Sequence, residues 1–197
     1  MQGLIIFIKN KKKGFVKTRL AATVGDDKAL AIYEQLLHIT QSVCLGVDAT
    51  RYVYYSTTIV ENDEWLSDFF SKKIQHQGDL GEKMYEAFRE ICAVHPKVVI
   101  IGSDCAALTS DIIQAAFDAL DSHDMSIGPA LDGGYYLLGL RAPHQSLFED
   151  IAWSTASVLK ETLQKAKILQ LSVYQLPTLS DIDNEADWNA FQSEKNR

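Results

Sequence analysis

The chain has 197 residues, the size of one domain that buries roughly 70% of the surface its unfolded chain exposes. Hydrophobic residues make up 47% and charged residues 23%, which excludes a disordered, collagen-like or low-complexity chain. The formal net charge is −7, and general binders of nucleic acids or anionic membranes need a basic surface. We therefore expect no nucleic-acid partner, and any anion site must be local.

The cysteines and the apolar segments indicate the compartment. Cys44, Cys92 and Cys105 form no C-x-x-C pair, are odd in number and lie in apolar surroundings, which argues against a zinc site and a disulfide framework. The apolar segment 4–8 is too short for a signal-peptide core, and no other run approaches the roughly 20 apolar residues of a membrane span. We expect a cytoplasmic protein without a membrane span.

The hydrophobic pattern alternates between strands and helices along the chain. Short apolar runs such as 97–101 are typical of buried strands, and Leu30, Tyr33 and Leu37 recur at near-helical spacing. In the first half of the chain we expect strands at 3–9, 51–56 and 73–76 and helices at 26–44, 63–70 and 80–93. In the second half we expect strands at 97–101, 126–130, 135–140 and 169–174 and helices at 109–120, 155–165 and 185–191.

Strands separated by helices of this length imply parallel βαβ units. The predicted fold class is α/β, a mostly parallel twisted sheet with helices on both faces. No repeat or linker divides the chain, so residues 1–197 are expected to form a single domain. Ligands of such sheets bind at the carboxyl ends of the strands, which directs attention to the loops after Lys9, His76, Ile101, Ala130 and Tyr174.

The first loop, residues 9–20, concentrates six cations around a glycine in an otherwise acidic protein. Gly14 would let backbone N–H groups approach a phosphate, and Lys17 and Arg19 would supply charge near a helix start. A solvated lysine loop is the alternative. The loop matches neither the Walker A motif G-x-x-x-x-G-K-[ST] nor the motif G-x-G-x-x-G. Its composition alone therefore indicates a candidate phosphate loop and no more.

The segment G-S-D-C after the apolar run 97–101 places Asp104 at the carboxyl end of a central strand. A carboxylate there can hold Mg²⁺ against a diphosphate, because Mg²⁺ prefers few protein oxygens together with phosphates and waters. Alternatively, Asp104 or Thr109 only caps the following helix. We interpret Cys105 as a small buried residue, since no histidine partner is evident nearby.

Two glycine-rich segments are predicted at the same sheet edge. Gly133 and Gly134, which follow Asp132, form either a tight hairpin turn or an open space for an acceptor. The segment 78–81 contacts a nucleotide or is simply a helix entry capped by Asp79.

An acidic cluster at 179–188 precedes the last helix. Asp183 is an ordinary N-cap candidate, and Asp181 or Asp183 could be a second metal contact. The histidines show no H-x-x-x-H spacing, so zinc chemistry has no support.

Taken together and in order, the motifs resemble a known family. They are K-x-x-x-x-G-x-V-K-T-R-L, D-L-G-E-K-M, I-G-S-D-C, G-P-A-x-D-G-G-Y-Y-L-L-G-L, W-S-T and D-I-D, and they extend over nearly the whole chain. The chain is similar to the bacterial nucleotide-diphospho-sugar transferase-like family of GT-A type fold. Members are generally named as glycosyltransferases and are similar to phospholactate and molybdenum-cofactor guanylyltransferases.

The resemblance implies residue roles. The phosphates would bind Lys9, Gly14, Lys17 and Arg19; Asp104 and Lys17 would carry catalysis; and Asp104 and Asp183 would hold Mg²⁺ or Mn²⁺. The base and ribose would face Gly78, Asp79, Leu80 and Gly81, and the acceptor would lie against Asp132, Gly133 and Gly134. The family's prolines in the first loop, the proline after S-D-C and the arginine of the D-L-G turn are absent here, where 10–13, Ala106 and Lys83 stand instead. A loop without those prolines is expected to be more mobile.

Three functions are consistent with these motifs. The first is a metal-dependent glycosyltransferase with a nucleotide-sugar donor and a small-molecule acceptor. The second is a guanylyltransferase-like nucleotidyltransferase. The segment G-S-D-C favours it, because this segment has a single aspartate where glycosyltransferases of this fold often have a D-x-D metal pair. The third is a catalytically inactive nucleotide-binding or partner-binding module. The sequence does not identify the donor nucleotide, the acceptor or the oligomeric state.

Overall fold

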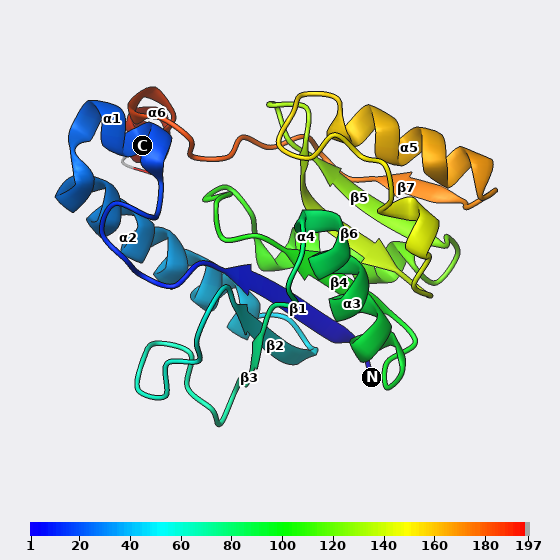
Figure 1. The fold of residues 1–197 in the computed structure, drawn as a ribbon. Coiled ribbons are helices and arrows are strands. Elements are labelled where there is room, and N and C mark those ends of the chain that lie inside the picture. The colour runs from blue at the N-terminus through cyan, green and yellow to red at the C-terminus, as the bar shows by residue number, and fades with distance from the viewer. Residues whose placement is uncertain (196–197) are drawn as a thin grey trace.

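The computed structural model describes residues 1–195, which form a twisted sheet covered by helices (Figure 1). The strands are β1 (Gly3–Ile8), β2 (Thr50–Tyr55), β3 (Ser71–Ile74), β4 (Val98–Ile101), β5 (Met125–Pro129), β6 (Tyr135–Leu140) and β7 (Val173–Gln175). The helices are α1 (Thr18–Val24), α2 (Asp26–Leu45), α3 (Leu80–Cys92), α4 (Ser110–Ala119), the short 3-10 helix η1 (Gln145–Leu147), α5 (Val158–Ile168) and α6 (Glu185–Lys195).

The sheet is mostly parallel. Its seven strands have the order β3-β2-β1-β4-β6-β5-β7. Strand β6 is antiparallel to both of its neighbours, whereas the other neighbouring strands pair in parallel. Because β6 runs in the opposite direction, it begins at the sheet edge where β1 and β4 end. The predicted α/β class is therefore confirmed, and the same edge receives residues from both halves of the chain.

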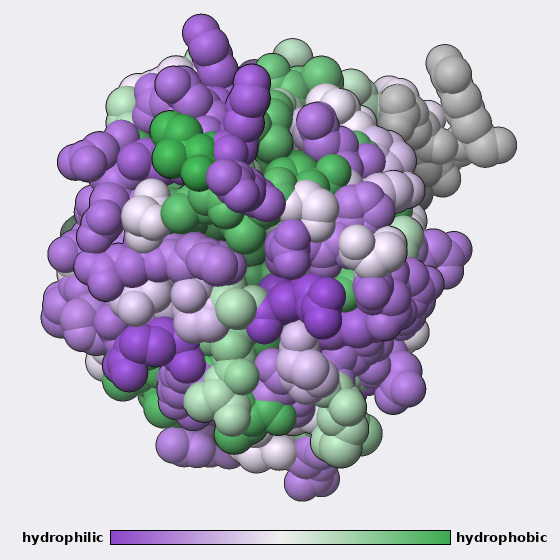
Figure 2. Space-filling view, turned by 90° about the vertical axis from the view of Figure 1, so that its right-hand side faces the viewer, coloured by the Kyte–Doolittle hydropathy of each residue, from purple (hydrophilic) through white to green (hydrophobic). Residues whose placement is uncertain are grey.

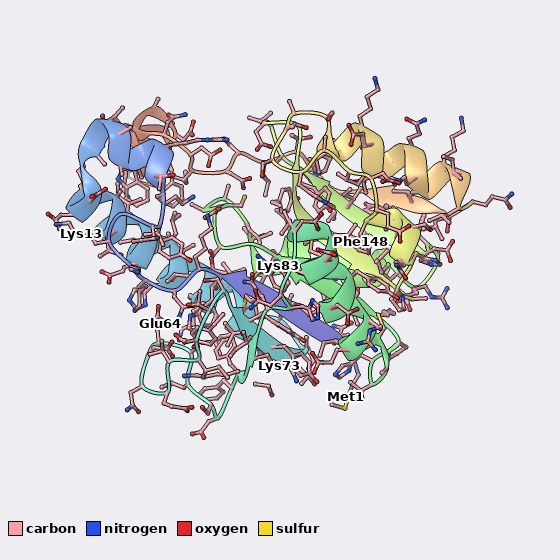
Figure 3. All side chains as sticks on the ribbon, viewed as in Figure 1. Met1, Lys13, Glu64, Lys73, Lys83 and Phe148 are labelled. Atoms are coloured by element: carbon pink, nitrogen blue, oxygen red, sulfur yellow. The ribbon has the colours of Figure 1, made fainter. Side chains whose placement is uncertain are left out.

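The core lies on both faces of the sheet because side chains of a strand alternate between faces. On β1, Leu4, Ile6 and Ile8 belong to one hydrophobic cluster with α2 and α4, whereas Ile5 belongs to another with α3 and α5. In the second cluster Phe148 joins the segment after η1 to α3, with its ring centroid 5.9 Å from that of Phe88 (Figure 3). Helices α1 and α6 pack together beyond the sheet (Figure 1).

The helix expected at 63–70 is wrong, because this segment forms bends and turns. Asp63 is taken up by tertiary contacts: its carboxylate accepts hydrogen bonds from the Tyr55 hydroxyl at 2.6 Å and from Lys72 Nζ at 2.8 Å. Trp65 is fully buried, and its ring packs edge-on against Phe70. Burial of one aromatic ring therefore fixes this segment, a feature that hydrophobic spacing alone cannot distinguish from a helix.

The other predicted elements are present, and most of their ends agree within one residue; larger shifts occur at β3, α5, β7 and α6, which continues to Lys195 instead of ending near 191. Helix α1 was expected only as a helix start near Lys17 and Arg19, without bounds. Strand β3 covers 71–74 instead of 73–76, and α5 begins three residues later than expected. The strand expected at 169–174 is shortened to β7, because α5 continues to Ile168 and Gln170 turns the chain with a φ of 56°. Element type is more readily predicted than element ends.

The surface over α5 and β7 is mainly hydrophilic (Figure 2). Across residues 1–195, none of the helices has both the length and the apolar character that crossing a membrane requires.

Candidate active site

A cavity of about 630 Å³ lies at the carboxyl ends of β1 and β4 and at the start of β6. This is the edge at which open α/β sheets bind ligands, and the volume is in the range of small-molecule sites. Among the described residues that line the cavity, the cations are Lys9, Lys17 and Arg19, and the carboxylates are Asp104, Asp132, Asp181 and Asp183. The cavity therefore brings together the first loop, the segment after β4, the turn before β6 and the segment before α6.

Lys17 joins three of these segments. Its Nζ lies 2.7 Å from Asp104 Oδ1 and donates a hydrogen bond of 2.7 Å to the Ile182 carbonyl oxygen. The Lys17 side chain is almost fully buried, and its backbone is left-handed with a φ of 49°. A non-glycine residue in that conformation is strained by about 1–3 kcal/mol, a cost that recurs at functional sites. The buried ammonium therefore fixes the position of the Asp104 carboxylate.

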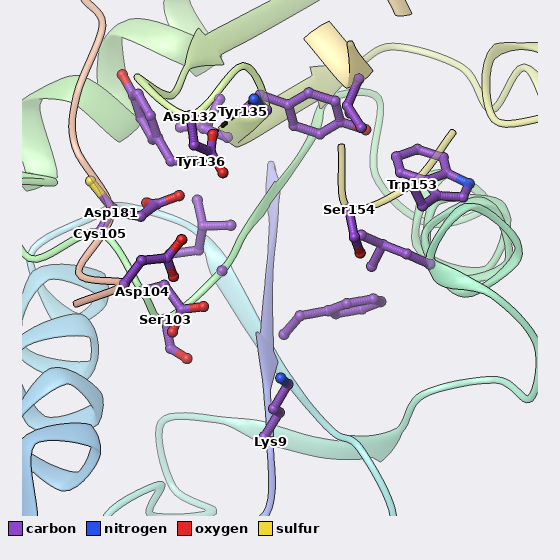
Figure 4. A pocket seen from close by; sticks show the side chains of 18 of the residues that line it. Lys9, Ser103, Asp104, Cys105, Asp132, Tyr135, Tyr136, Trp153, Ser154 and Asp181 are labelled. Carbon is purple, nitrogen blue, oxygen red and sulfur yellow. Dashed lines mark hydrogen bonds between the residues drawn. The ribbon is translucent and has the colours of Figure 1, made fainter. Parts of the chain in front are cut away.

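Asp104, Asp132 and Asp181 lie close together on one side of the cavity (Figure 4). Burial, followed by the negative charges of Asp104 and Asp132, raises the pKa of Asp181 from 3.8 to about 7, against the opposing effect of Lys17. Besides burial, the like charges of two neighbouring carboxylates disfavour the ionised form of Asp181. This side of the cavity is therefore suited to a cation.

The end of β1 is fixed by Tyr33 of α2. The Lys9 backbone N–H donates a hydrogen bond of 2.8 Å to the Tyr33 hydroxyl, which donates one of 2.9 Å to the Lys9 carbonyl oxygen. The next residue, Asn10, connects the first loop to the segment after β2. Its side chain accepts a 2.9 Å hydrogen bond from the Thr57 N–H and donates one of 2.7 Å to the Thr58 carbonyl oxygen. These bonds hold the start of the loop at Lys9 and Asn10.

Arg19 and Asp183 form an ion pair, with 3.2 Å between Arg19 Nη1 and Asp183 Oδ2. The position before α6 is capped by Asn184 instead of Asp183: Asn184 Oδ1 accepts a 3.1 Å hydrogen bond from the Asp187 N–H. Neither Asp183 nor Asp104 therefore serves as a helix cap, because α4 is capped by Thr109, and both carboxylates pair instead with cations of the cavity.

The remaining predicted nucleotide contacts are only partly gathered at the cavity. Leu80 lines it, whereas Gly14, Gly78, Asp79 and Gly81 are outside its described lining. Asp79 caps α3 in a capping box with Glu82, which is the structural alternative that the sequence left open. A β-carbon at Gly81 would lie 2.7 Å from Trp153 Nε1, so this glycine permits close packing of the indole against α3.

The two glycines of the turn before β6 differ. Gly133 has a φ of 90°, and a β-carbon there would overlap the Ala156 carbonyl oxygen, so this glycine is required by the turn. Gly134 lines the cavity and has no such φ; a β-carbon there would lie 3.2 Å from Asp132 Oδ1. The Gly134 N–H donates a 2.8 Å hydrogen bond to that same oxygen. Only Gly134 therefore borders the predicted acceptor space.

The carboxylates fit a divalent cation that also has substrate ligands. Within residues 1–195 no group of three or more histidine, cysteine, aspartate or glutamate residues is arranged to hold a metal ion. Mg²⁺, however, usually takes one or two protein carboxylates together with phosphate oxygens and waters. The donor chemistry of Asp104 and its acidic neighbours meets that requirement. Cys105 takes no part in this chemistry, because burial raises the pKa of its thiol to about 12.

Sequence reasoning left the wall of the cavity opposite Asp104 unassigned. Trp153 and Ser154 lie on that wall, with Tyr135 of β6 nearby (Figure 4). The only sequence signal was the W-S-T motif, which has no periodicity of its own.

The fold is that of the nucleotide-diphospho-sugar transferase-like family. The chain is similar to a protein from Desulfovibrio desulfuricans G20 described as a "putative nucleotide-diphospho-sugar transferase", with 31% identity and a TM-score of 0.90 over 99% of this chain and 88% of the other. Residues 39–155 match the family described as "Uncharacterized protein conserved in bacteria (DUF2064)", and the chain belongs to that family.

More distant structures share the fold. The 4-diphosphocytidyl-2C-methyl-D-erythritol synthase of Anaerococcus prevotii DSM 20548 is 9% identical, with a TM-score of 0.63 over 100% of this chain and 98% of the other. The inositol-1-phosphate CTP transferase of T. maritima is 16% identical, with a TM-score of 0.60 over 98% of this chain and 94% of the other. None of the curated proteins compared with the chain matches it.

Proposed function

We propose that the protein is a metal-assisted transferase that uses a nucleotide-activated donor, with glycosyl transfer from a nucleoside diphosphate sugar as its reaction. The proposal rests on one observation: a single cavity at the carboxyl edge of the sheet is lined both by clustered carboxylates and by Lys9, Lys17 and Arg19. Cations next to acidic metal ligands are what a diphosphate and its divalent cation require. The description of the D. desulfuricans relative is consistent with this donor.

Lys17 and Arg19 would bind the donor phosphates, and Lys9 would stand at the same end of the cavity. Both Lys17 and Arg19 now contact carboxylates, so phosphate oxygens would replace or supplement Asp104 and Asp183 as their partners. Asp104, with Asp183 as a second contact, would hold Mg²⁺ or Mn²⁺. That cation would neutralise the charge that develops on the leaving diphosphate.

The acceptor would approach from the side of Asp132 and Gly134. Its hydroxyl oxygen forms a bond to the anomeric carbon of the sugar while the bond from that carbon to the diphosphate oxygen breaks. The nucleoside diphosphate leaves with the bonding electron pair, and the acceptor proton passes to a carboxylate, a role that we assign to Asp132 because it lines the cavity beside Gly134. The protein contributes position and charge more than covalent chemistry.

Nucleotidyl transfer is the second candidate, because the segment after β4 supplies one aspartate with a buried lysine against it. In that reaction the acceptor oxygen bonds to the α-phosphorus of a nucleoside triphosphate, and pyrophosphate leaves. The same residues would serve both reactions. They differ in the bond that breaks and in the group released.

The released group tests the proposal. The protein would be incubated with Mg²⁺ or Mn²⁺ and sets of nucleoside diphosphate sugars and nucleoside triphosphates, with water or added sugars as acceptors. Release of nucleoside diphosphate from the sugars, lost in Asp104→Asn, is the expected result. Pyrophosphate release supports the second candidate instead. Saturable nucleotide binding without either product would identify an inactive binding module and overturn both.

A further inference from the structure

The cavity wall opposite the carboxylates is aromatic and has no role in the phosphate chemistry. We define the aromatic wall as Phe7 of β1, Tyr135 of β6 and Trp153, all of which line the cavity. Trp153 and Ser154 lie across the cavity from Asp104 and Asp181 (Figure 4). The described cations of the cavity, by contrast, all come from residues 9–19, the loop after β1 and the first turn of α1.

Trp153 is held in place from behind. Its indole packs against Gly81 in the first turn of α3, where any larger residue would collide with Nε1. The partly buried ring also belongs to the hydrophobic cluster of α3 and α5. A ring fixed on one side and open on the other is a preformed surface for stacking, because little conformational freedom is lost on binding.

The backbone on either side of Trp153 is strained. Asp150 and Ser154 have φ values of 51° and 65°, a region that residues other than glycine rarely adopt. Glu161 of α5 holds the segment by accepting hydrogen bonds of 2.8 Å from the Ala152 N–H and 2.6 Å from the Ser157 hydroxyl. A strained backbone conformation that hydrogen bonds maintain indicates a function for the side chains that it positions. The residues positioned here are the indole and the Ser154 side chain, which points into the cavity (Figure 4).

The aromatic wall belongs to the acceptor half of the cavity. The segment with Trp153 packs on the turn before β6: the Leu159 N–H donates a 2.9 Å hydrogen bond to the Gly133 carbonyl, and Ala156 abuts Gly133. Asp132 and Gly134 of that turn border the proposed acceptor space. The part of the wall formed by Trp153 is thus continuous with the acceptor side.

We infer that the aromatic wall binds the acceptor through an uncharged hydroxylated ring, such as a sugar or a glycoside, with the Ser154 hydroxyl as a polar contact. The inference rests on the proposed transferase function. Aliphatic C–H groups of such a ring stack on an indole, while its hydroxyls reach Ser154 and Asp132. Among the described residues, neither the segment of Trp153 nor the turn of Asp132 supplies a cation to the cavity, and the Asp132 carboxylate would repel a phosphorylated acceptor.

A matched pair of probes tests the inference: phenyl β-D-glucopyranoside and its 6-phosphate. Binding of each to the full chain, saturated with Mg²⁺ and UDP, would be measured by ligand-observed NMR. We expect the neutral glucoside to bind at least about tenfold more tightly than its 6-phosphate. Trp153→Ala should weaken its binding by about tenfold, as loss of one aromatic stack predicts, and Trp153→Phe should restore most of it. Trp188→Phe, a change in α6 outside the cavity, is the control and should have no effect.

The outcomes separate this inference from the proposed function. If no saturable binding of the neutral glucoside occurs, or if the 6-phosphate binds as well, the inference is overturned. It is also overturned if Trp153→Ala weakens binding of the free nucleoside uridine and leaves the glucoside unaffected, because the wall would then bind the base. The proposed function is read independently from UDP binding, which the Trp153 variants should leave nearly unchanged if the wall binds the acceptor.

Discussion

Asp181→Asn should make the protein more stable at pH 8, and the gain should disappear near pH 4. In the folded protein, burial and the charges of Asp104 and Asp132 raise the pKa of Asp181 from 3.8 to about 7. Between these values the folded state binds a proton that the unfolded chain has lost, so stability falls as the pH rises through this range. The cost of the ionised carboxylate is fully present above about pH 7 and absent below about pH 4.

The size of this cost follows from the pKa difference. Raising a pKa from 3.8 to about 7 is equivalent to about 4 kcal/mol of unfolding free energy. Because the cavity is open to solvent, screening reduces the effect, and we expect about 2 kcal/mol. For a chain of 197 residues this corresponds to a rise in Tm of about 4–8 °C. Asparagine has nearly the same shape as aspartate, so the packing around Asp181 is preserved.

Unfolding in urea at several pH values, followed by circular dichroism, is the suitable assay. Asp68→Asn removes an exposed carboxyl outside the cavity and serves as the matched control, with little change expected at any pH. A variant Asp181→Asn that is no more stable than the wild type at pH 8 would refute the reasoning. An equal gain at pH 4 and pH 8 would refute it as well, because it would not arise from ionisation.

Other substitutions test the phosphate, metal and acceptor contacts separately. Asp104→Asn should fold and should weaken Mg²⁺-dependent nucleotide binding at least about tenfold, measured by calorimetric titration; unchanged affinity would exclude Asp104 as a metal ligand. Lys17→Ala and Arg19→Ala should each weaken binding of nucleoside di- and triphosphates by about 10- to 100-fold but leave binding of the nucleoside nearly unchanged, and equal losses would indicate a general structural effect. Gly134→Ala should retain nucleotide binding and lose transfer to the acceptor, whereas Gly133→Ala should lower Tm, because its φ of 90° disfavours a side chain. A normal transfer rate in Gly134→Ala would show that the acceptor lies elsewhere.

The arrangement of strands and helices could be predicted because it depends on local patterns. The apolar runs that became β1 and β4 are buried on both faces, as continuous hydrophobic strands require. The false helix at 63–70 shows the limit of such patterns. Asp63 and Trp65 make their contacts with Tyr55, Lys72 and Phe70, and these contacts exist only in the folded chain.

The candidate site was predicted in part. Lys17, Arg19, Asp104, Asp132 and Gly134 all line the cavity, because the ends of parallel strands meet at one edge. The left-handed backbone of Lys17 was not predictable, since lysine has no preference for that conformation and tertiary contacts impose it.

Two further features of the site lay beyond the sequence. The raised pKa of Asp181 depends on the charges of Asp104 and Asp132, which come from other segments. Trp153 lies in the segment I-A-W-S-T-A, which has no periodicity, and only the folded chain shows that it lines the cavity and packs on Gly81.

The central claim is that the cavity binds a nucleotide through its phosphates together with a divalent cation. Thermal unfolding of the wild type and of Arg19→Ala, with UDP-glucose, UTP or uridine and the corresponding guanosine and cytidine compounds, each with and without Mg²⁺, tests it most directly. A ligand at 100 times its Kd adds about 2.7 kcal/mol of stability. We predict that at least one phosphorylated compound raises the wild-type Tm in a Mg²⁺-dependent manner, and that Arg19→Ala loses most of this rise. If no phosphorylated compound shifts the wild-type Tm with Mg²⁺, or if Arg19→Ala responds like the wild type, the claim is contradicted.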